Sequence, residues 1–223
     1  FAAAAIALLV LDGRIRMEDD IRKYFPEMPQ YQTPITVRHL VHHTSGIRDI
    51  YGIMALSGKR LEDVYTDSQA IAAIARQKEL NFKPGDQYLY SNSGYFLLGQ
   101  LVKRVTGKSL RVFADERMFR PLGMLQTHFH DDPGHIMKMR AMSYEPANAR
   151  RTTGGTEEGG GGGYRISYIQ NFDKIGAGGL YTTLDDLLKW DENYYTKKLG
   201  GEDFHKLVHT RGVLNNGDTL TYA

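Results

Sequence analysis

The sequence contains no cysteine, and this absence removes several kinds of chemistry at once. Disulfide scaffolds, thiolate zinc sites and cysteine nucleophiles all require a thiol. The sequence also has little excess of charge of either sign, because 28 Lys and Arg residues stand against 26 Asp and Glu residues. This balance, without a basic stripe, argues against a nucleic-acid partner. Chemistry is therefore expected from Ser, Tyr, His, Lys or carboxylate side chains.

The apolar run from Phe1 to Leu11 is too short to span a bilayer, so no transmembrane segment is expected in this chain. No Met and no basic segment precede the run, which argues against a signal peptide. Ala and Leu are strong helix formers and Asp12-Gly13 is a good stop, so the run predicts a buried helix. Because the chain opens in the middle of this helix, we expect it to be a fragment of a longer protein.

Helical patterns dominate the rest of the chain. Four further helices are expected: one starting at Thr36 and ending near Thr44, one capped by Ser68, one from Gly94 to Val105, and one from Ser109 to Phe119 that breaks at Pro121. Short strands are expected within residues 126–130 and 179–183. A last helix begins at Thr183, with Leu184, Leu187 and Leu188 as its apolar face. No repeat or linker divides the chain, so we predict a single α+β domain over residues 1–223.

Two patterns suggest ligand sites but lack the partners that such sites require. The glycine run from Gly159 to Gly163 could cradle a phosphate, yet no Gly-Lys-Ser/Thr follows it, so a surface loop is the better interpretation. Histidines suggest a metal centre, although their spacing matches no established zinc motif. We predict no metal and no cofactor, and keep a histidine-based metal protein as the weakest alternative; the histidines concerned are His39, His42, His43, His128, His130 and His135.

The segment Tyr88-Leu-Tyr90-Ser91-Asn92 just before the strongest helix carries a sharper signal. In an extended segment, Tyr90 and Asn92 point their side chains the same way and can share a site. A Tyr oxygen can move protons when nearby cations lower its pKa from about 10, and an Asn amide can orient a carbonyl and an ammonium group together. The alternative is that Asn92 caps the next helix while tyrosines pack beneath it.

Four segments in the same order resemble the serine beta-lactamase-like family, and most of all its class C beta-lactamases, D-Ala-D-Ala carboxypeptidases and related esterases. These segments are Ile35-Thr-Val-Arg-His-Leu-Val-His-His-Thr-Ser-Gly46, Tyr90-Ser-Asn-Ser-Gly-Tyr-Phe-Leu-Leu-Gly99, Pro121-Leu-Gly-Met124 and Gly176-Ala-Gly-Gly-Leu-Tyr-Thr-Thr-Leu-Asp-Asp-Leu-Leu-Lys-Trp190. The resemblance implies that Tyr90 and Asn92 are catalytic: Tyr90 helps to move the proton of the nucleophile, and Asn92 holds the substrate and the catalytic lysine.

Family members carry a Ser-x-x-Lys motif just before a helix that resembles the run from Phe1. The resemblance therefore places the nucleophilic serine and its lysine upstream of Phe1. No Ser-x-x-Lys occurs within the chain, and the nearest match, Ser45-Gly-Ile-Arg48, ends in a guanidinium group that cannot act as a base. No Gly-x-Ser-x-Gly elbow is present either. Arg48 and Asp49 are expected to border the cleft.

The family's third element, Lys-Thr-Gly or His-x-Gly on an edge strand, has no clear counterpart. Lys198-Leu-Gly200 has the spacing, but it follows a predicted helix and fits a helix end and loop better. We expect both ends to be truncated, so that the helical region remains and much of the antiparallel sheet is absent.

The sequence thus predicts part of a serine hydrolase that forms an acyl-enzyme with a beta-lactam, a D-Ala-D-Ala peptide or a small ester. Its partner would be a small molecule or peptide, and the resemblance suggests a periplasmic or secreted protein. The alternative is a non-catalytic binding or regulatory member of the same fold.

Overall fold

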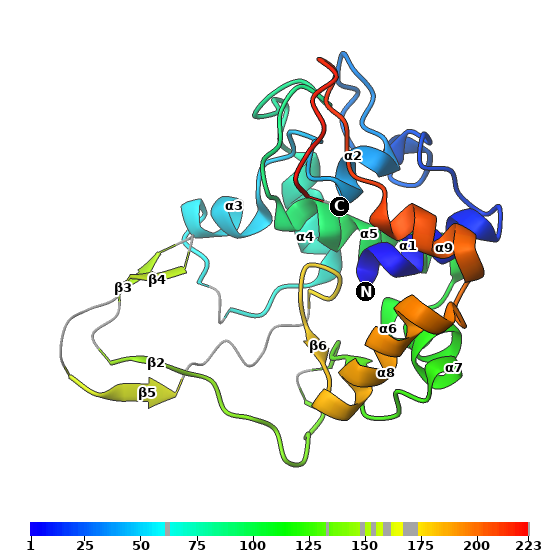
Figure 1. Ribbon diagram of the computed structural model, residues 1–223. Helices are drawn as coiled ribbons and strands as arrows, with labels where there is room; N and C mark the ends of the chain where they lie inside the picture. Colours follow the sequence, from blue (N-terminus) through cyan, green and yellow to red (C-terminus); the bar gives the residue numbers. More distant parts are fainter. Residues whose placement is uncertain are drawn as a thin grey trace.

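The computed structural model describes residues 1–60, 63–132, 134–147, 150–152, 155–157, 162–166 and 174–222. Helices form the body of the protein (Figure 1). Their bounds are α1 Ala2–Leu11, α2 Val37–Val41, α3 Ile50–Leu56, α4 Asp67–Ala75, α5 Asn92–Thr106, α6 Leu110–Ala114, α7 Arg120–Leu122, α8 Leu184–Thr196 and α9 Gly201–His209. A 3-10 turn covers Ile21–Lys23, and a π-helical segment, Asp115–Phe119, joins α6 to α7.

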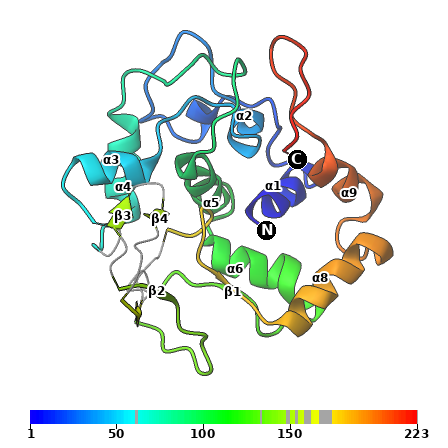
Figure 2. The same ribbon diagram turned by 60° about the vertical axis from the view of Figure 1, so that its left-hand side comes forward.

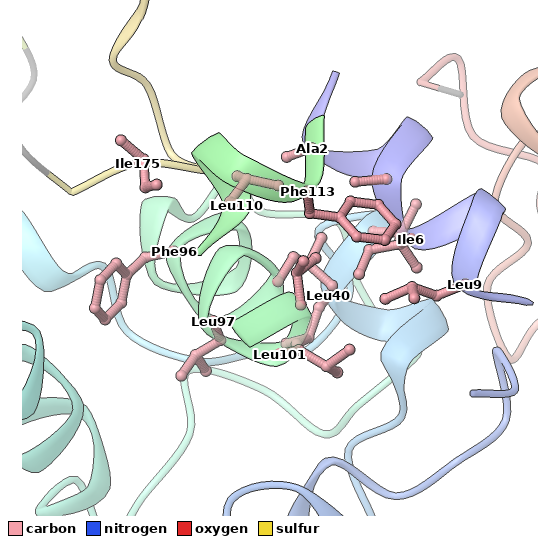
Figure 3. Packing of buried hydrophobic residues seen from close by; sticks show 14 of the residues in the cluster. Ala2, Ile6, Leu9, Leu40, Phe96, Leu97, Leu101, Leu110, Phe113 and Ile175 are labelled. Carbon is pink, nitrogen blue, oxygen red and sulfur yellow. The ribbon is translucent and has the colours of Figure 1, made fainter. Parts of the chain in front are cut away.

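The core is built around α5 and α1, which pack against each other (Figures 2 and 3). On α5, Phe96, Leu97 and Leu101 are fully buried, and the helix ends at Gly107, whose φ of 75° is in the left-handed region that favours glycine. Helix α1 has an alanine-rich surface that is buried almost throughout, and it also contacts α9. Both helices confirm the expectations from sequence.

The described strands pair in three short antiparallel ladders. β1 (His128–Phe129) pairs with β6 (Leu180–Tyr181), which confirms that residues 126–130 and 179–183 contain strands. The other pairs are β2 (Tyr144–Pro146) with β5 (Tyr164–Ile166), and β3 (Arg150–Thr152) with β4 (Gly155–Glu157). A helical body with a small antiparallel component confirms the α+β class.

Three helix predictions are corrected by the structure. Helix α3 was not predicted; it forms because Asp49 caps it and its residues Ile50 and Met54 are buried. Helix α4 is capped by Thr66 rather than Ser68, in a reciprocal box with Gln69. Pro121 does not break the chain's helical course, because it lies in the first turn of α7, where a missing N–H is tolerated.

The predicted apolar face of α8 is wrong. Leu184 is 81% exposed and Leu188 is 63% exposed, whereas Asp186 is buried in the same helix. The reason is that Asp186 accepts hydrogen bonds from the Gln126 backbone N–H at 2.8 Å and the Thr127 hydroxyl at 2.9 Å. This polar link sets which side of α8 faces the protein.

The segment Lys198–Gly200 is a turn between α8 and α9, as the helix-end interpretation predicted. Helix α8 ends with Lys197 in the left-handed conformation, and α9 begins directly after Gly200. Within the described residues, no helix is both long and apolar enough to cross a membrane. In the glycine run, Gly159, Gly160 and Gly161 lie outside the described residues.

Candidate active site

Tyr90 and Asn92 come together where the chain enters α5. Ser91 between them has extended backbone angles (φ −143°, ψ 120°), and the side chains on either side of it meet: the Tyr90 hydroxyl donates to Asn92 Oδ1 at 3.3 Å. Tyr90 is 55% exposed, so the pair lies at the protein surface. The juxtaposition predicted from the alternation of side chains is confirmed, while its catalytic role stays a prediction.

Asn92 does not cap α5, so the alternative interpretation of this residue is wrong. The N-cap position is occupied by Ser91, without a side-chain cap bond, and Asn92 is the first residue of the helix. Its side chain is committed elsewhere, since Asn92 Nδ2 donates to Asp49 Oδ2 at 2.8 Å. The backbone N–H of Asn92 donates to the same oxygen at 2.6 Å.

Asp49 determines which way the Asn92 amide faces. An ionised carboxylate only accepts hydrogen bonds, so the amide group next to Asp49 must be the NH₂ and not the carbonyl. The carbonyl Oδ1 of Asn92 is thereby turned toward Tyr90. Asp49 is itself anchored, because its Oδ1 accepts from the Tyr51 backbone N–H at 2.9 Å at the start of α3. The site thus presents an acceptor oxygen beside a phenol, an arrangement that can hold an ammonium group.

The surroundings of Tyr90 keep its hydroxyl protonated. Burial raises the pKa of Tyr90 above its ordinary value, and Tyr222, Asp49 and Tyr88 add to the shift. Negative charge from a carboxylate disfavours a phenolate. A phenolate at Tyr90 would therefore depend on a cation brought next to the hydroxyl.

The serines within the chain near this pair are poorly placed to act as nucleophiles. Ser45 and Ser93 are buried, and the Ser93 hydroxyl donates to the Arg48 carbonyl at 2.7 Å. Ser91 is also buried, and its Oγ has no hydrogen-bond partner within the described part of the chain. The Arg48 guanidinium donates to Gln77 Oε1 at 3.1 Å.

Several of the histidines that were considered as metal ligands contact one another or the backbone. Across the described residues, no group of three or more His, Asp or Glu side chains is arranged to hold a metal ion. His128 and His130 do approach each other, with ring nitrogens 3.3 Å apart, and burial lowers the pKa of both. His39 accepts the Thr36 backbone N–H at 3.1 Å and closes the capping box of α2.

His43 is the residue of the site whose role the sequence did not indicate. It was considered only as a metal ligand, but it lies beneath Tyr90, with the two ring centroids 4.6 Å apart. The loop that carries it also carries Asp49, so residues 43–49 support the Tyr90–Asn92 pair. The N-capping pattern of Asp49 before Ile50 was the available local signal for this loop.

The fold of the chain is similar to solved structures of amide-cleaving proteins. The D-stereospecific amidohydrolase from Streptomyces sp. superposes with a TM-score of 0.77 over 96% of this chain and 63% of that one, at 22% identity. The D-amino acid amidase from Ochrobactrum anthropi SV3 gives 0.70 over 94% of this chain and 56% of that one, at 24% identity. At these identities the likeness concerns the fold.

Curated relatives are similar in sequence along most of the chain. Penicillin-binding protein 4* from Bacillus subtilis (strain 168) is 26% identical over 226 residues, which is 100% of this chain and 49% of that protein. A D-aminopeptidase from Brucella anthropi is 27% identical over 79% of this chain and 31% of that protein. The chain therefore spans half or less of the length of these relatives. The profile of the Beta-lactamase family matches residues 1–221, and the chain belongs to that family.

Proposed function

We propose that the chain is part of a serine hydrolase that cleaves an amide or ester bond through an acyl-enzyme, with Tyr90 and Asn92 in its active site. The observation that carries this proposal is the Tyr90–Asn92 pair at the surface of the protein. The Tyr90 hydroxyl donates to Asn92, and Asp49 orients the Asn92 amide. A pair held in this way is prepared to act on one substrate carbonyl, because little reorganisation is needed when the substrate binds.

The nucleophile in this proposal is a serine upstream of Phe1, followed three residues later by a lysine. The buried state of Ser45, Ser91 and Ser93 supports a nucleophile outside this sequence. A lysine ammonium placed beside Asn92 Oδ1 would meet the acceptor that Asp49 turns toward Tyr90. The same cation would lower the pKa of Tyr90, which the described surroundings raise.

Acyl transfer then proceeds in two steps. The serine oxygen attacks the substrate carbonyl while its proton passes toward Tyr90 or the lysine, and the amine or alcohol leaves with a proton returned from the same group. Water repeats the attack on the acyl-enzyme and releases the acid. In both steps the second hydrogen of Asn92 Nδ2 is available to the substrate, because Asp49 takes only the first.

We propose that the substrate is a short peptide or amide with a D-configured residue, and we prefer this class to a beta-lactam. Support comes from the printed names of relatives and structural neighbours, among them D-aminopeptidase and D-stereospecific amidohydrolase. A beta-lactam or a small ester presents the same reacting carbonyl and belongs in the same assay.

The test uses the protein extended upstream of Phe1 as its gene encodes it. We expect a fluorophosphonate or a fluorescent penicillin to label the upstream serine, and D-phenylalanine amide to be hydrolysed faster than its L-enantiomer. Labelling of Ser45, Ser91 or Ser93 would contradict the proposal. A folded protein that no probe labels would support the non-catalytic alternative instead.

A further inference from the structure

We infer that His43 is a positioning residue that holds Tyr90 for its part in the proposed reaction, by fastening the backbone on both sides of it. The backbone carbonyl of His43 accepts the Leu89 N–H at 3.0 Å. Its side-chain Nδ1 accepts the Ser91 N–H at 3.1 Å. The residues before and after Tyr90 are thus tied to a single residue that lies 46 and 48 positions earlier in the chain. This inference rests on the proposed function of Tyr90.

The imidazole ring of His43 also supports the Tyr90 ring directly. The two rings are inclined by 36° at a centroid distance of 4.6 Å, and the His43 ring stacks on Tyr95 at 4.8 Å and 20°. Tyr95 is itself held in place, because its hydroxyl donates to the Val41 carbonyl at 3.1 Å and lies 3.2 Å from the Tyr222 hydroxyl. An exposed tyrosine would otherwise sample several rotamers, and this contact restricts them.

The backbone of His43 is in an uncommon conformation that this arrangement requires. Its φ of 56° lies in the left-handed region, which few residues other than glycine adopt, although His and Asn are enriched among those that do. The turn directs the carbonyl and the ring of the same residue toward residues 89 and 91. Its neighbour Gly46 is also left-handed, at φ 72°, and a Cβ there would lie 2.2 Å from the Phe82 carbonyl oxygen. The loop is therefore closely fitted to the segment that precedes Tyr90.

The hydrogen bond to Ser91 fixes the charge state of His43. A ring nitrogen that accepts a hydrogen bond carries no proton, so His43 is neutral with its proton on Nε2. That Nε2 is buried and has no partner among the residues the structure describes. A buried donor without a partner is unusual. It indicates that the position of the ring is set by the hydrogen bond at Nδ1 and by the contact with Tyr90, and not by a partner for Nε2.

The supports of Tyr90 and Asn92 are separate. Asp49 holds Asn92 through two hydrogen bonds, and Ser93 is held by the Arg48 carbonyl. Tyr90 has a single bond of 3.3 Å through its hydroxyl, and the backbone donors with described partners in residues 88–91 both bond to His43. Loss of the His43 side chain should therefore disturb Tyr90 while leaving Asn92 and α5 in place.

The test compares His43→Ala with His43→Asn in the protein extended upstream of Phe1. Asn places an oxygen close to the position of Nδ1 and tolerates a left-handed backbone, so it keeps the acceptor for Ser91. The matched control is His42→Ala, because His42 is buried like its neighbour but its side chain lies next to Gly212 instead. If His43→Ala does not fold, His43→Gln replaces it. The Gln side chain is one bond longer than that of Asn, so its amide oxygen does not occupy the position of Nδ1.

We expect His43→Ala to exchange the Ser91 amide hydrogen at least about tenfold faster, with a smaller change at Leu89, whose acceptor is the backbone carbonyl. On a D-amino acid amide, kcat should fall by about 10²-fold with KM near that of the parent, because displacement by about 1 Å is enough to cause such a loss. His43→Asn should recover the Ser91 protection and part of kcat, and His42→Ala should change neither.

Two results would overturn the inference. An unchanged Ser91 exchange rate in His43→Ala would show that the hydrogen bond does not hold the segment. A faster exchange with unchanged kcat would reduce His43 to a structural role. If the parent protein itself neither reacts with probes nor cleaves substrate, the proposed function fails and the catalytic part of this inference fails with it, while the exchange rates still decide the contact.

Discussion

Two carboxylates in this protein accept hydrogen bonds from distant segments, but the consequences for the two regions differ. Asp49 precedes α3 and Asp186 lies in the first turn of α8, and each accepts hydrogen bonds from a segment far away in the sequence. Asp186 binds Gln126 and Thr127, and its other oxygen receives the Lys189 ammonium at 2.7 Å. Both carboxylate oxygens of Asp186 are thus bonded to groups within the protein. Asp49 instead turns the free carbonyl of Asn92 toward an exposed tyrosine.

The difference lies in what remains unsatisfied. Around Asp186 burial opposes ionisation, but Lys189 and the donors of Gln126 and Thr127 outweigh it and hold its pKa below the ordinary value. Around Asp49, by contrast, His43 Nε2 and Ser91 Oγ have no described partners. A fully satisfied polar network rigidifies a fold, whereas unpaired buried polar groups call for another explanation, of which a functional role is one.

The largest effect should come from breaking the paired network. Asp186→Ala leaves the Gln126 N–H and the Thr127 hydroxyl without their acceptor, so we expect the free energy of unfolding to fall by about 3 kcal/mol. Urea denaturation measures it. The control is Asp185→Ala on the exposed side of the same turn, which should change stability by less than about 0.5 kcal/mol. Equal effects of the two variants would contradict the role of Asp186.

Removal of the Tyr90 hydroxyl should lower activity without lowering stability. Tyr90→Phe deletes a proton-transfer group at an exposed position, so we expect unchanged unfolding and a fall of about 10²-fold in the acylation rate of the upstream serine. Stopped-flow labelling with a fluorescent penicillin measures the rate. Tyr88→Phe, two residues earlier and 41% exposed, is the matched control. Acylation at the parental rate would return Tyr90 to a packing role.

The link between Asp49 and Asn92 can be tested by exchanging the two groups. Asn92→Asp places a second carboxylate within hydrogen-bond distance of Asp49, so it should destabilise the protein by about 1–2 kcal/mol at pH 7 and abolish most activity. The double variant Asp49→Asn with Asn92→Asp restores one carboxylate and one amide and should recover at least about 0.5 kcal/mol. Thermal denaturation of the parent, of the single variants Asn92→Asp and Asp49→Asn and of the double variant gives the coupling energy. Strict additivity would show that the contact is not formed.

As the pH falls, the region around His43 and Asp49 should lose stability at a higher pH than the region around Asp186. Burial lowers the pKa of both His42 and His43 from 6.5 to about 4. Between these values the unfolded chain binds protons that the folded chain does not, so stability falls as pH falls. From pH 7 to 5.5 the loss is about 1 kcal/mol for each histidine.

Burial sets the direction of the His43 shift, and the neighbouring groups modify it. The rings of Tyr88, Tyr90, Tyr95 and Tyr222 face the His43 ring, while His42 opposes protonation of His43 and Asp49 favours it. Between pH 7 and 5.5 the hydrogen-exchange protection factor should fall at the Ser91 amide and not at the Gln126 amide, whose acceptor Asp186 stays ionised. An equal fall in protection at both amides would contradict the separation of the two networks.

Local sequence was sufficient for features that depend on neighbours along the chain. Apolar residues at helical spacing and Gly107 predicted α5, and alternation along one extended segment predicted that Tyr90 and Asn92 meet. The leucines of α8 show the limit of this reasoning. Their spacing indicated a buried face, but the buried residue of that turn is Asp186, because its bonds to Gln126 and Thr127 orient the helix.

By itself, then, the sequence determined the helices whose apolar residues and caps lie within one segment, the presence of short strands near residues 128 and 181, and the family motif around Tyr90. That these two strands pair with each other was shown only by the structure. The tertiary structure decided which polar groups support that motif. Asp49 and Asn92 are 43 residues apart, and His43 and Ser91 are 48 apart. Such contacts have no periodicity or spacing that a local pattern could reveal, because they form only when α2, α3 and α5 pack together and bring buried donors and acceptors within reach.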